Sequence, residues 1–122
     1  MVIEIQFIKN CEEKSIPIIE ITRSKNGKTG TATFIFIKPK VFDHMHLIDK
    51  PIKSIILINK HEQIISKDIT FFYLEGKPFV IKAIFLFKNS KEWFCFFTFM
   101  RDYSKKTGLS FSEKDNRIFP FF

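Results

Sequence analysis

Hydrophobic and polar residues alternate with a period of two along the first three quarters of the chain, which is the pattern of half-buried strands. The alternation predicts strands over about 3–7, 16–22 and 31–37. The loop at 24–30 contains Asn-Gly, a dipeptide typical of tight hairpin turns. The second and third strands are therefore predicted to form a hairpin.

The middle of the chain shows the same alternation after an interruption at Pro39. Residues 40–51 are predicted to form a connection with a short helical turn. The runs at 52–58, 63–74 and 79–87 are then predicted to form a three-strand meander, since polar turn residues separate them.

A helical pattern follows the last strand. Asn89 is a predicted N-cap with Glu92 three residues later, and Gly108 is the predicted residue after the helix, which runs to about Lys106. Four apolar residues recur at helical spacing and are predicted to pack on the sheet: Trp93, Phe96, Phe97 and Met100. The helix is also apolar beyond this stripe, at Phe94, Cys95 and Phe99, so either both faces are buried or one meets a partner or a membrane.

Together these patterns predict a mainly β fold with a C-terminal helix (α+β). We expect a small antiparallel β-sandwich or barrel-like domain of about six strands with one helix packed on it. A single domain is expected over 1–116, followed by an apolar C-terminal tail over 117–122. A chain of 122 residues is long enough to bury a core without a disulfide or metal. No apolar run reaches the roughly 18 residues of a spanning helix.

The composition is basic, with a formal net charge of +7. Such a charge is compatible with a nucleic acid, an anionic membrane or an acidic protein partner. The chain also has 20 Ile, 17 Phe and 17 Lys. These residues have A/T-rich codons, so a biased genome such as an organelle's explains part of the charge.

Motifs for catalysis and for metal binding are weak. Gly27-Lys28-Thr29 resembles the end of a phosphate-binding loop, but the upstream Gly is missing and a strand follows instead of a helix. His44 and His46 lack a third ligand other than His61, and the two cysteines have no zinc spacing. We therefore expect no catalytic residues, no cofactor and no metal. The N-terminus also lacks the features of a secretory signal or a transit peptide.

Two stretches of the chain resemble one protein family. The first is Thr-Arg-Ser-Lys-Asn-Gly-Lys-Thr-Gly-Thr-Ala-Thr-Phe-Ile-Phe at 22–36, ending at Pro39. The second begins with Glu92-Trp93 and continues through Phe96, Phe99-Met100, Tyr103, Gly108-Leu109 and Phe111, with a Gly-x-Pro turn at 76–78. These segments resemble the photosystem II reaction-centre Psb28 (Psb-twenty-eight) family of extrinsic assembly factors, over about 3–114.

The resemblance implies a cofactor-free protein, peripheral to the thylakoid membrane on its stromal side, or on its cytoplasmic side in a cyanobacterium. It implies transient binding to the inner-antenna subunit and the reaction-centre core of photosystem II intermediates. We expect a monomer that binds no nucleic acid. The A/T-rich composition fits a plastid-encoded member, and a cyanobacterial origin stays open.

We expect docking by β-strand addition, in which a partner segment pairs with an exposed edge. The strand at 31–37 is the predicted edge, and lysines around it are predicted to steer the partner. The predicted partner-binding residues are Arg23, Lys25, Lys28, Thr31, Thr33, Ile35, Lys38 and Lys40. Solvated turn lysines are the alternative for the basic residues. The alternative function is a basic single-stranded nucleic-acid-binding β-domain, because Phe71, Phe72 and Tyr73 lie in a chain rich in lysine.

Overall fold

The computed structural model describes residues 2–43, 51–60, 62–109, 111–113 and 118–119, which form two sheets, one α-helix and one 3-10 turn. Sheet A has the strand order β2–β1–β5–β6, with β1 at Ile3–Ile8, β2 at Cys11–Glu12, β5 at Ile55–Asn59 and β6 at Glu62–Ser66. Sheet B has the order β10–β9–β3–β4–β8–β7, with β3 at Ile18–Arg23, β4 at Gly30–Ile37, β7 at Ile69–Leu74, β8 at Lys77–Phe87, β9 at Phe111–Glu113 and β10 at Ile118–Phe119. The turn η1 spans Lys40–Asp43 and the helix α1 spans Ser90–Thr107.

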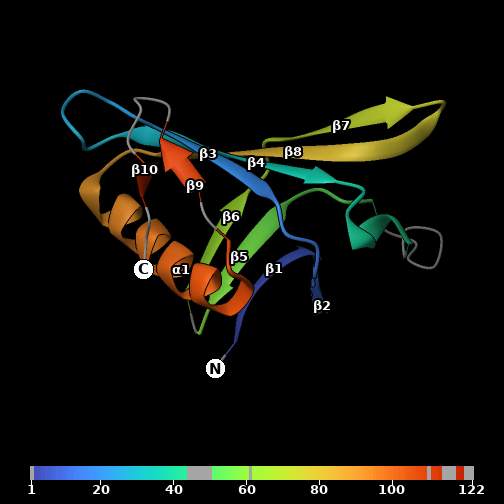
Figure 1. Cartoon of the computed structure of the whole chain (residues 1–122), viewed down its shortest axis with the longest axis horizontal. Helices are drawn as coiled ribbons and strands as arrows, with labels where there is room; N and C mark the ends of the chain where they lie inside the picture. Colours follow the sequence, from blue (N-terminus) through green and yellow to red (C-terminus); the bar gives the residue numbers. More distant parts are fainter. Residues whose placement is uncertain (1, 44–50, 61, 110, 114–117, 120–122) are drawn as a thin grey trace.

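Sheet B forms the upper layer in Figure 1, and sheet A lies with α1 beneath it. The predicted fold class, a mainly β sandwich with one C-terminal helix, is confirmed. The strands are more numerous than the six predicted because three two- or three-residue strands were not anticipated and one predicted strand is divided. The pairing is antiparallel except between β3 and β9, which run parallel.

The core lies between the lower face of sheet B and the other layer. Ala32, Phe34 and Phe36 alternate along β4 and are all fully buried, as the period of two predicts. The ring of Phe34 lies 5.2 Å from that of Phe85 on β8 and 6.2 Å from that of Phe96 on α1, between ring centroids. The helix is thus attached to sheet B through aromatic contacts.

The prediction of one strand over 63–74 is wrong. The chain bends after β6, and β7 then pairs with β8 in the other sheet, so the predicted meander is split between two layers. The hydroxyl of Ser66 accepts a hydrogen bond from the backbone N–H of Asp68 at 3.1 Å and donates one to the carbonyl of Ile84. A serine hydroxyl that replaces backbone partners in this way favours a turn over a continuous strand.

Both ends of α1 form as predicted. The side chain of Asn89 accepts the backbone N–H of Glu92 at 2.9 Å, and Gly108 adopts a φ of 78° and donates its N–H to Ser104. Of the apolar residues beyond the predicted stripe, Phe99 belongs to the core with 1% exposure, whereas Phe94 is 73% exposed. The helix packs against β1 and β5 as well as β8, which explains why its buried surface is wider than one stripe.

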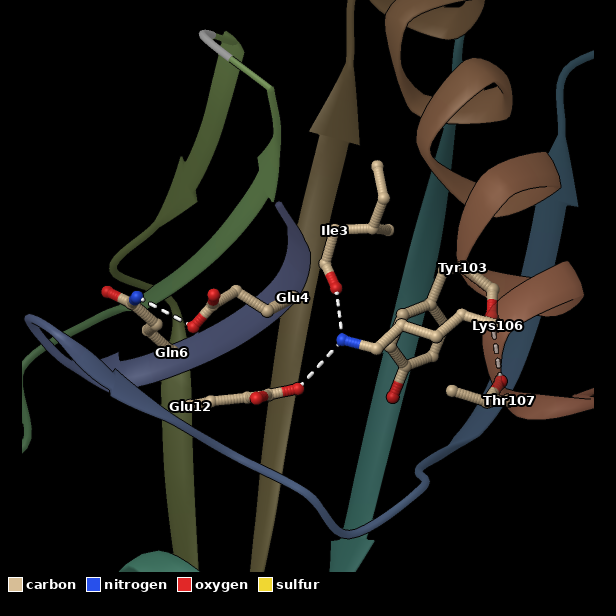
Figure 2. A network of polar contacts seen from close by, with 7 residues as sticks. All are labelled: Ile3, Glu4, Gln6, Glu12, Tyr103, Lys106 and Thr107. Carbon is tan, nitrogen blue, oxygen red and sulfur yellow. Dashed lines mark hydrogen bonds and ion pairs between the residues drawn. The ribbon is translucent and has the colours of Figure 1, made fainter. Parts of the chain in front are cut away.

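The C-terminal end of α1 is fastened to sheet A. Figure 2 shows the Lys106 ammonium group donating to the carbonyl of Ile3 at 2.7 Å and lying 2.9 Å from the Glu12 carboxylate. A second carboxylate, that of Glu13, is buried and accepts the backbone N–H groups of Lys40 and Val41, both at 2.8 Å. Glu13 therefore caps η1 and holds the segment that follows β4.

Two glycines of the β3–β4 hairpin have different functions. Gly27 has a φ of 71°, the left-handed conformation that the turn requires. Gly30 has no such conformation, but a Cβ atom there would collide with the Thr22 carbonyl oxygen and the Trp93 ring. The close approach of α1 to the hairpin thus depends on the missing side chain of Gly30.

Candidate docking site

The prediction that the strand at 31–37 is an exposed edge is wrong. β4 pairs with β3 on one side and with β8 on the other along almost its whole length. Its backbone N–H and C=O groups are therefore taken up within sheet B and cannot receive a further strand. Thr31, Thr33 and Ile35 point to the outer face of the sheet, where their side chains are half-buried.

The predicted basic residues do not converge on one place. Lys25 and Lys28 are exposed in the loop before β4, whereas Lys38 and Lys40 are exposed after it. An eight-residue strand separates the two pairs by about 25 Å. Each pair can act on a partner, but the two do not form one rim.

Arg23 is half-buried and packs against the helix. Its guanidinium carbon lies 5.2 Å from the ring centroids of both Trp93 and Phe97, and these two rings stack at 5.0 Å. A cation over two aromatic faces stabilises the contact between β3 and α1. The geometry thus gives Arg23 a structural function.

Unpaired strand edges lie elsewhere in the described part of the chain. β6 and β2 are the end strands of sheet A, and β7 and β10 are the end strands of sheet B. β7 pairs with β8 only as far as Ala83, so the last residues of β8 extend beyond their neighbour. The backbone N–H of Ile84 donates to the Asp68 carbonyl at 3.0 Å, so it points toward the β7 side of β8. Leu86 follows two residues later in the same strand. Because alternate residues of a strand direct their backbone groups to the same side, Leu86 presents its N–H and C=O at this open edge.

The two open edges of β6 and β8 border one groove, which we call the edge groove. It has a volume of about 870 Å³ and is lined by β6, the end of β8 and the first turns of α1. Ile65 and Leu86, which are 54% and 62% exposed, line it together with Cys95 of the helix. The five residues of β6 span roughly 17 Å, the length of a typical short strand.

The charges around the edge groove are balanced. Its lining includes three lysines, Lys67, Lys88 and Lys91, and three carboxylates, Glu62, Asp68 and Glu92. One carboxylate is already engaged, because Glu92 accepts the backbone N–H of Lys88 at 2.6 Å. Backbone pairing with apolar contacts is therefore the interaction that this groove offers, rather than attraction of a polyanion.

The β7 edge is less suited to strand pairing. Its register with β8 shifts between Phe72 and Tyr73, and such a bulge twists an edge away from a further strand. The edge groove, by contrast, is bordered by the open edge of β6 and by the end of β8. The groove is therefore the better candidate docking site.

The described residues hold no group of three or more His, Cys, Asp or Glu side chains arranged for a metal ion. His44, His46 and His61, the histidines considered above as metal ligands, lie outside the described residues. Within the part that the structure describes, no helix has the length and apolar character needed to cross a membrane.

Comparison with known proteins shows the family. The family model "Psb28 protein" matches residues 5–111. The chain belongs to the Psb28 family. It is 38% identical over 112 residues to "Photosystem II reaction center Psb28 protein" of Guillardia theta, which covers 92% of this chain and 97% of that protein. The protein of the same name from Trichormus variabilis is 36% identical over 110 residues, covering 90% of this chain and 97% of its own length.

The Psb28 match includes β6, β8 and α1, so the edge groove lies within the family's domain. Sequence reasoning missed this groove because it treated 63–74 as one strand. A signal was available: that run is twelve residues long, about twice the usual strand, and Ser-Lys-Asp at 66–68 interrupts it.

Proposed function

We propose that this protein is a non-catalytic, extrinsic assembly or repair factor that docks transiently on photosystem II intermediates. Membership of the Psb28 family supports the partner, since the relatives are named photosystem II reaction center Psb28 proteins. The observation that carries the docking mode is the edge groove, which has an unpaired strand edge on each side. The proposed partners are the inner-antenna subunit and the reaction-centre core, bound from the stromal side of the thylakoid membrane.

The proposed mechanism is β-strand addition in the edge groove. An extended partner segment pairs with β6 on one side and with the Leu86 end of β8 on the other, which joins sheets A and B through the partner. Main-chain hydrogen bonds supply the affinity. The apolar side chains of Ile65 and Leu86 receive alternate side chains of the segment, because successive residues of a strand point to opposite faces.

Hydrogen exchange on the bound complex tests the docking mode directly. Photosystem II assembly intermediates are mixed with the labelled full-length protein, and co-migration on a native gel establishes binding. Exchange at the Leu86 amide and at alternate amides of β6 is then expected to slow on binding, since these groups become hydrogen-bonded. Protection of β7 amides instead would place the added strand at the edge of sheet B. That result would contradict docking in the edge groove but not binding to photosystem II.

A variant that fills the edge groove tests the docking site, and the same substitution at the neighbouring position is its matched control. Cys95→Trp places a large side chain in the groove, and Phe94→Trp places the same side chain at the adjacent, exposed position. Binding to the intermediates is expected to weaken at least tenfold for Cys95→Trp and to be unchanged for Phe94→Trp, with equal thermal midpoints as the folding control. If the wild-type protein co-migrates with no photosystem II intermediate, the proposed function itself is wrong.

A further inference from the structure

The open edge of β8 begins where its pairing with β7 ends. β8 spans Lys77–Phe87, but β7 pairs with it only from Lys77 to Ala83. Successive residues of a strand direct their backbone groups to opposite sides. The carbonyl of Phe79 accepts the backbone N–H of Lys38, directly after β4, at 2.8 Å, so the odd-numbered residues of β8 face β4. The even-numbered residues beyond Ala83 therefore face the side on which β7 has ended.

The first of these residues, Ile84, is already bonded within the fold. Its backbone N–H donates to the carbonyl of Asp68 at 3.0 Å, and its carbonyl accepts a hydrogen bond from the hydroxyl of Ser66. The Ser66 hydroxyl also accepts the backbone N–H of Asp68 at 3.1 Å, so the turn between β6 and β7 is fixed against β8. This turn closes the edge of β8 at Ile84, where both main-chain groups are occupied.

The edge is closed again two residues after Leu86. The backbone N–H of Lys88 donates to the carboxylate of Glu92, in the first turn of α1, at 2.6 Å. Glu92 is itself held in place, because its backbone N–H donates to the Asn89 side chain at 2.9 Å. Leu86 is therefore the even-numbered residue of β8 that lies between two closed positions, and it lines the edge groove.

The fold anchors Leu86 without using its outward backbone groups. The residue opposite Leu86 on β4 is Thr31, and by the alternation the hydrogen bonds to β4 come from Phe85 and Phe87 instead. Both phenylalanines are buried, at 2% and 3% exposure, whereas Leu86 is 62% exposed. The N–H and C=O of Leu86 are thus presented to the groove by a strand that is anchored on both sides of this residue.

We propose that Leu86 sets the register of the partner segment in the edge groove. This inference rests on the proposed function, and it specifies how a segment of a photosystem II intermediate lies in that site. Leu86 offers two main-chain hydrogen bonds, while the N–H groups two positions before and after it are occupied, so the segment cannot shift along β8. The edge of β6 alone allows a shift by two residues, because such a shift leaves every side chain on its original face. Leu86 therefore decides which partner side chain lies against Cys95.

A proline at position 86 tests the proposal directly. Leu86→Pro removes the outward N–H but no hydrogen bond to β4, and strands accept proline where the missing donor faces away from a neighbouring strand. Leu86→Ala shortens the same side chain and keeps the N–H, so it is the matched control. Binding of the full-length protein to purified photosystem II intermediates is measured by co-migration over a concentration series. It is expected to weaken at least about tenfold for Leu86→Pro, because a partner carbonyl loses its donor, and less than about threefold for Leu86→Ala, with thermal midpoints within a few degrees of the wild type.

Two outcomes of this experiment separate the role of Leu86 from the proposed function. Wild-type binding by Leu86→Pro overturns the role of Leu86 in setting the register and leaves the photosystem II partner in place. A wild-type protein that co-migrates with no intermediate overturns the proposed function instead.

Hydrogen exchange gives a second measurement, which does not depend on how the proline variant folds. On binding, exchange at the wild-type Leu86 amide is expected to slow at least about tenfold. Exchange at the Ile84 and Lys88 amides is expected to change little, because both are bonded already in the free protein. Slower exchange at Lys88 without a change at Leu86 overturns the proposal, since the segment would then lie two residues further along β8.

Discussion

At the scale of single residues, Trp93 joins the helix to both strands of the hairpin. It is 4% exposed, its ring lies 4.8 Å from that of Phe87, and the guanidinium carbon of Arg23 lies 5.2 Å from the centroid of its ring. Trp93→Ala is expected to lower the free energy of unfolding by about 3–5 kcal/mol, because a buried aromatic leaves a large cavity. Phe94→Ala, one residue along and 73% exposed, should change it by less than about 0.5 kcal/mol. Urea unfolding measures both, and a wild-type midpoint for Trp93→Ala would contradict the burial.

Tyr103 gives the fold an expected sensitivity to alkaline pH. Burial, and then the nearby carboxylates of Glu13 and Glu12, raise the pKa of Tyr103 well above its ordinary value near 10. The folded state therefore keeps this proton after the unfolded state has lost it, so the free energy of unfolding should fall as the pH rises above about 10. Urea midpoints across that range should fall less for Tyr103→Phe than for the wild type. Tyr73→Phe removes an exposed phenol and is the matched control.

At the scale of elements, the turn after β6 decides which sheet each half of 63–74 enters. The Ser66 side chain is buried and bonds both Asp68 and Ile84. Ser66→Ala is expected to cost about 1–3 kcal/mol of stability, since it leaves buried backbone groups without a partner. Ser90→Ala, at an exposed position of α1, should be nearly neutral. Thermal unfolding distinguishes them, and equal midpoints would show that the Ser66 hydroxyl is not needed for the turn.

At the scale of the whole molecule, the distribution of charge separates the photosystem proposal from the nucleic-acid alternative. The net charge is +7, but the four lysines that flank β4 lie in two pairs at its opposite ends, and the edge groove is balanced in charge. Binding to nucleic acid depends on cations gathered along one path with stacking aromatics. We therefore expect affinity for single-stranded RNA no tighter than non-specific binding, with dissociation constants above about 1 μM at physiological salt. A fluorescence titration with a labelled oligonucleotide measures this, and tight binding that falls steeply with salt would favour the alternative.

The sequence alone determined the features that depend on neighbouring residues. The buried alternation of Ala32, Phe34 and Phe36 follows from the period of two, and both ends of α1 follow from the capping side chain of Asn89 and the left-handed conformation of Gly108. The resemblance of two segments to the Psb28 family was also visible in the sequence, and the family match confirms it. Each of these signals is local, because a strand face, a cap and a turn need only a few adjacent residues.

Tertiary structure decided which strands are central and which have free edges. The sequence predicts an edge at β4 because an outward face of Thr31, Thr33 and Ile35 looks the same whether or not the strand has a partner on each side. Side-chain alternation reports the two faces of a strand, whereas an edge is defined by backbone pairing with residues far away in the chain. The edge groove exists for the same reason: Ser66 turns the chain out of sheet A, and β7 stops pairing with β8 at Ala83.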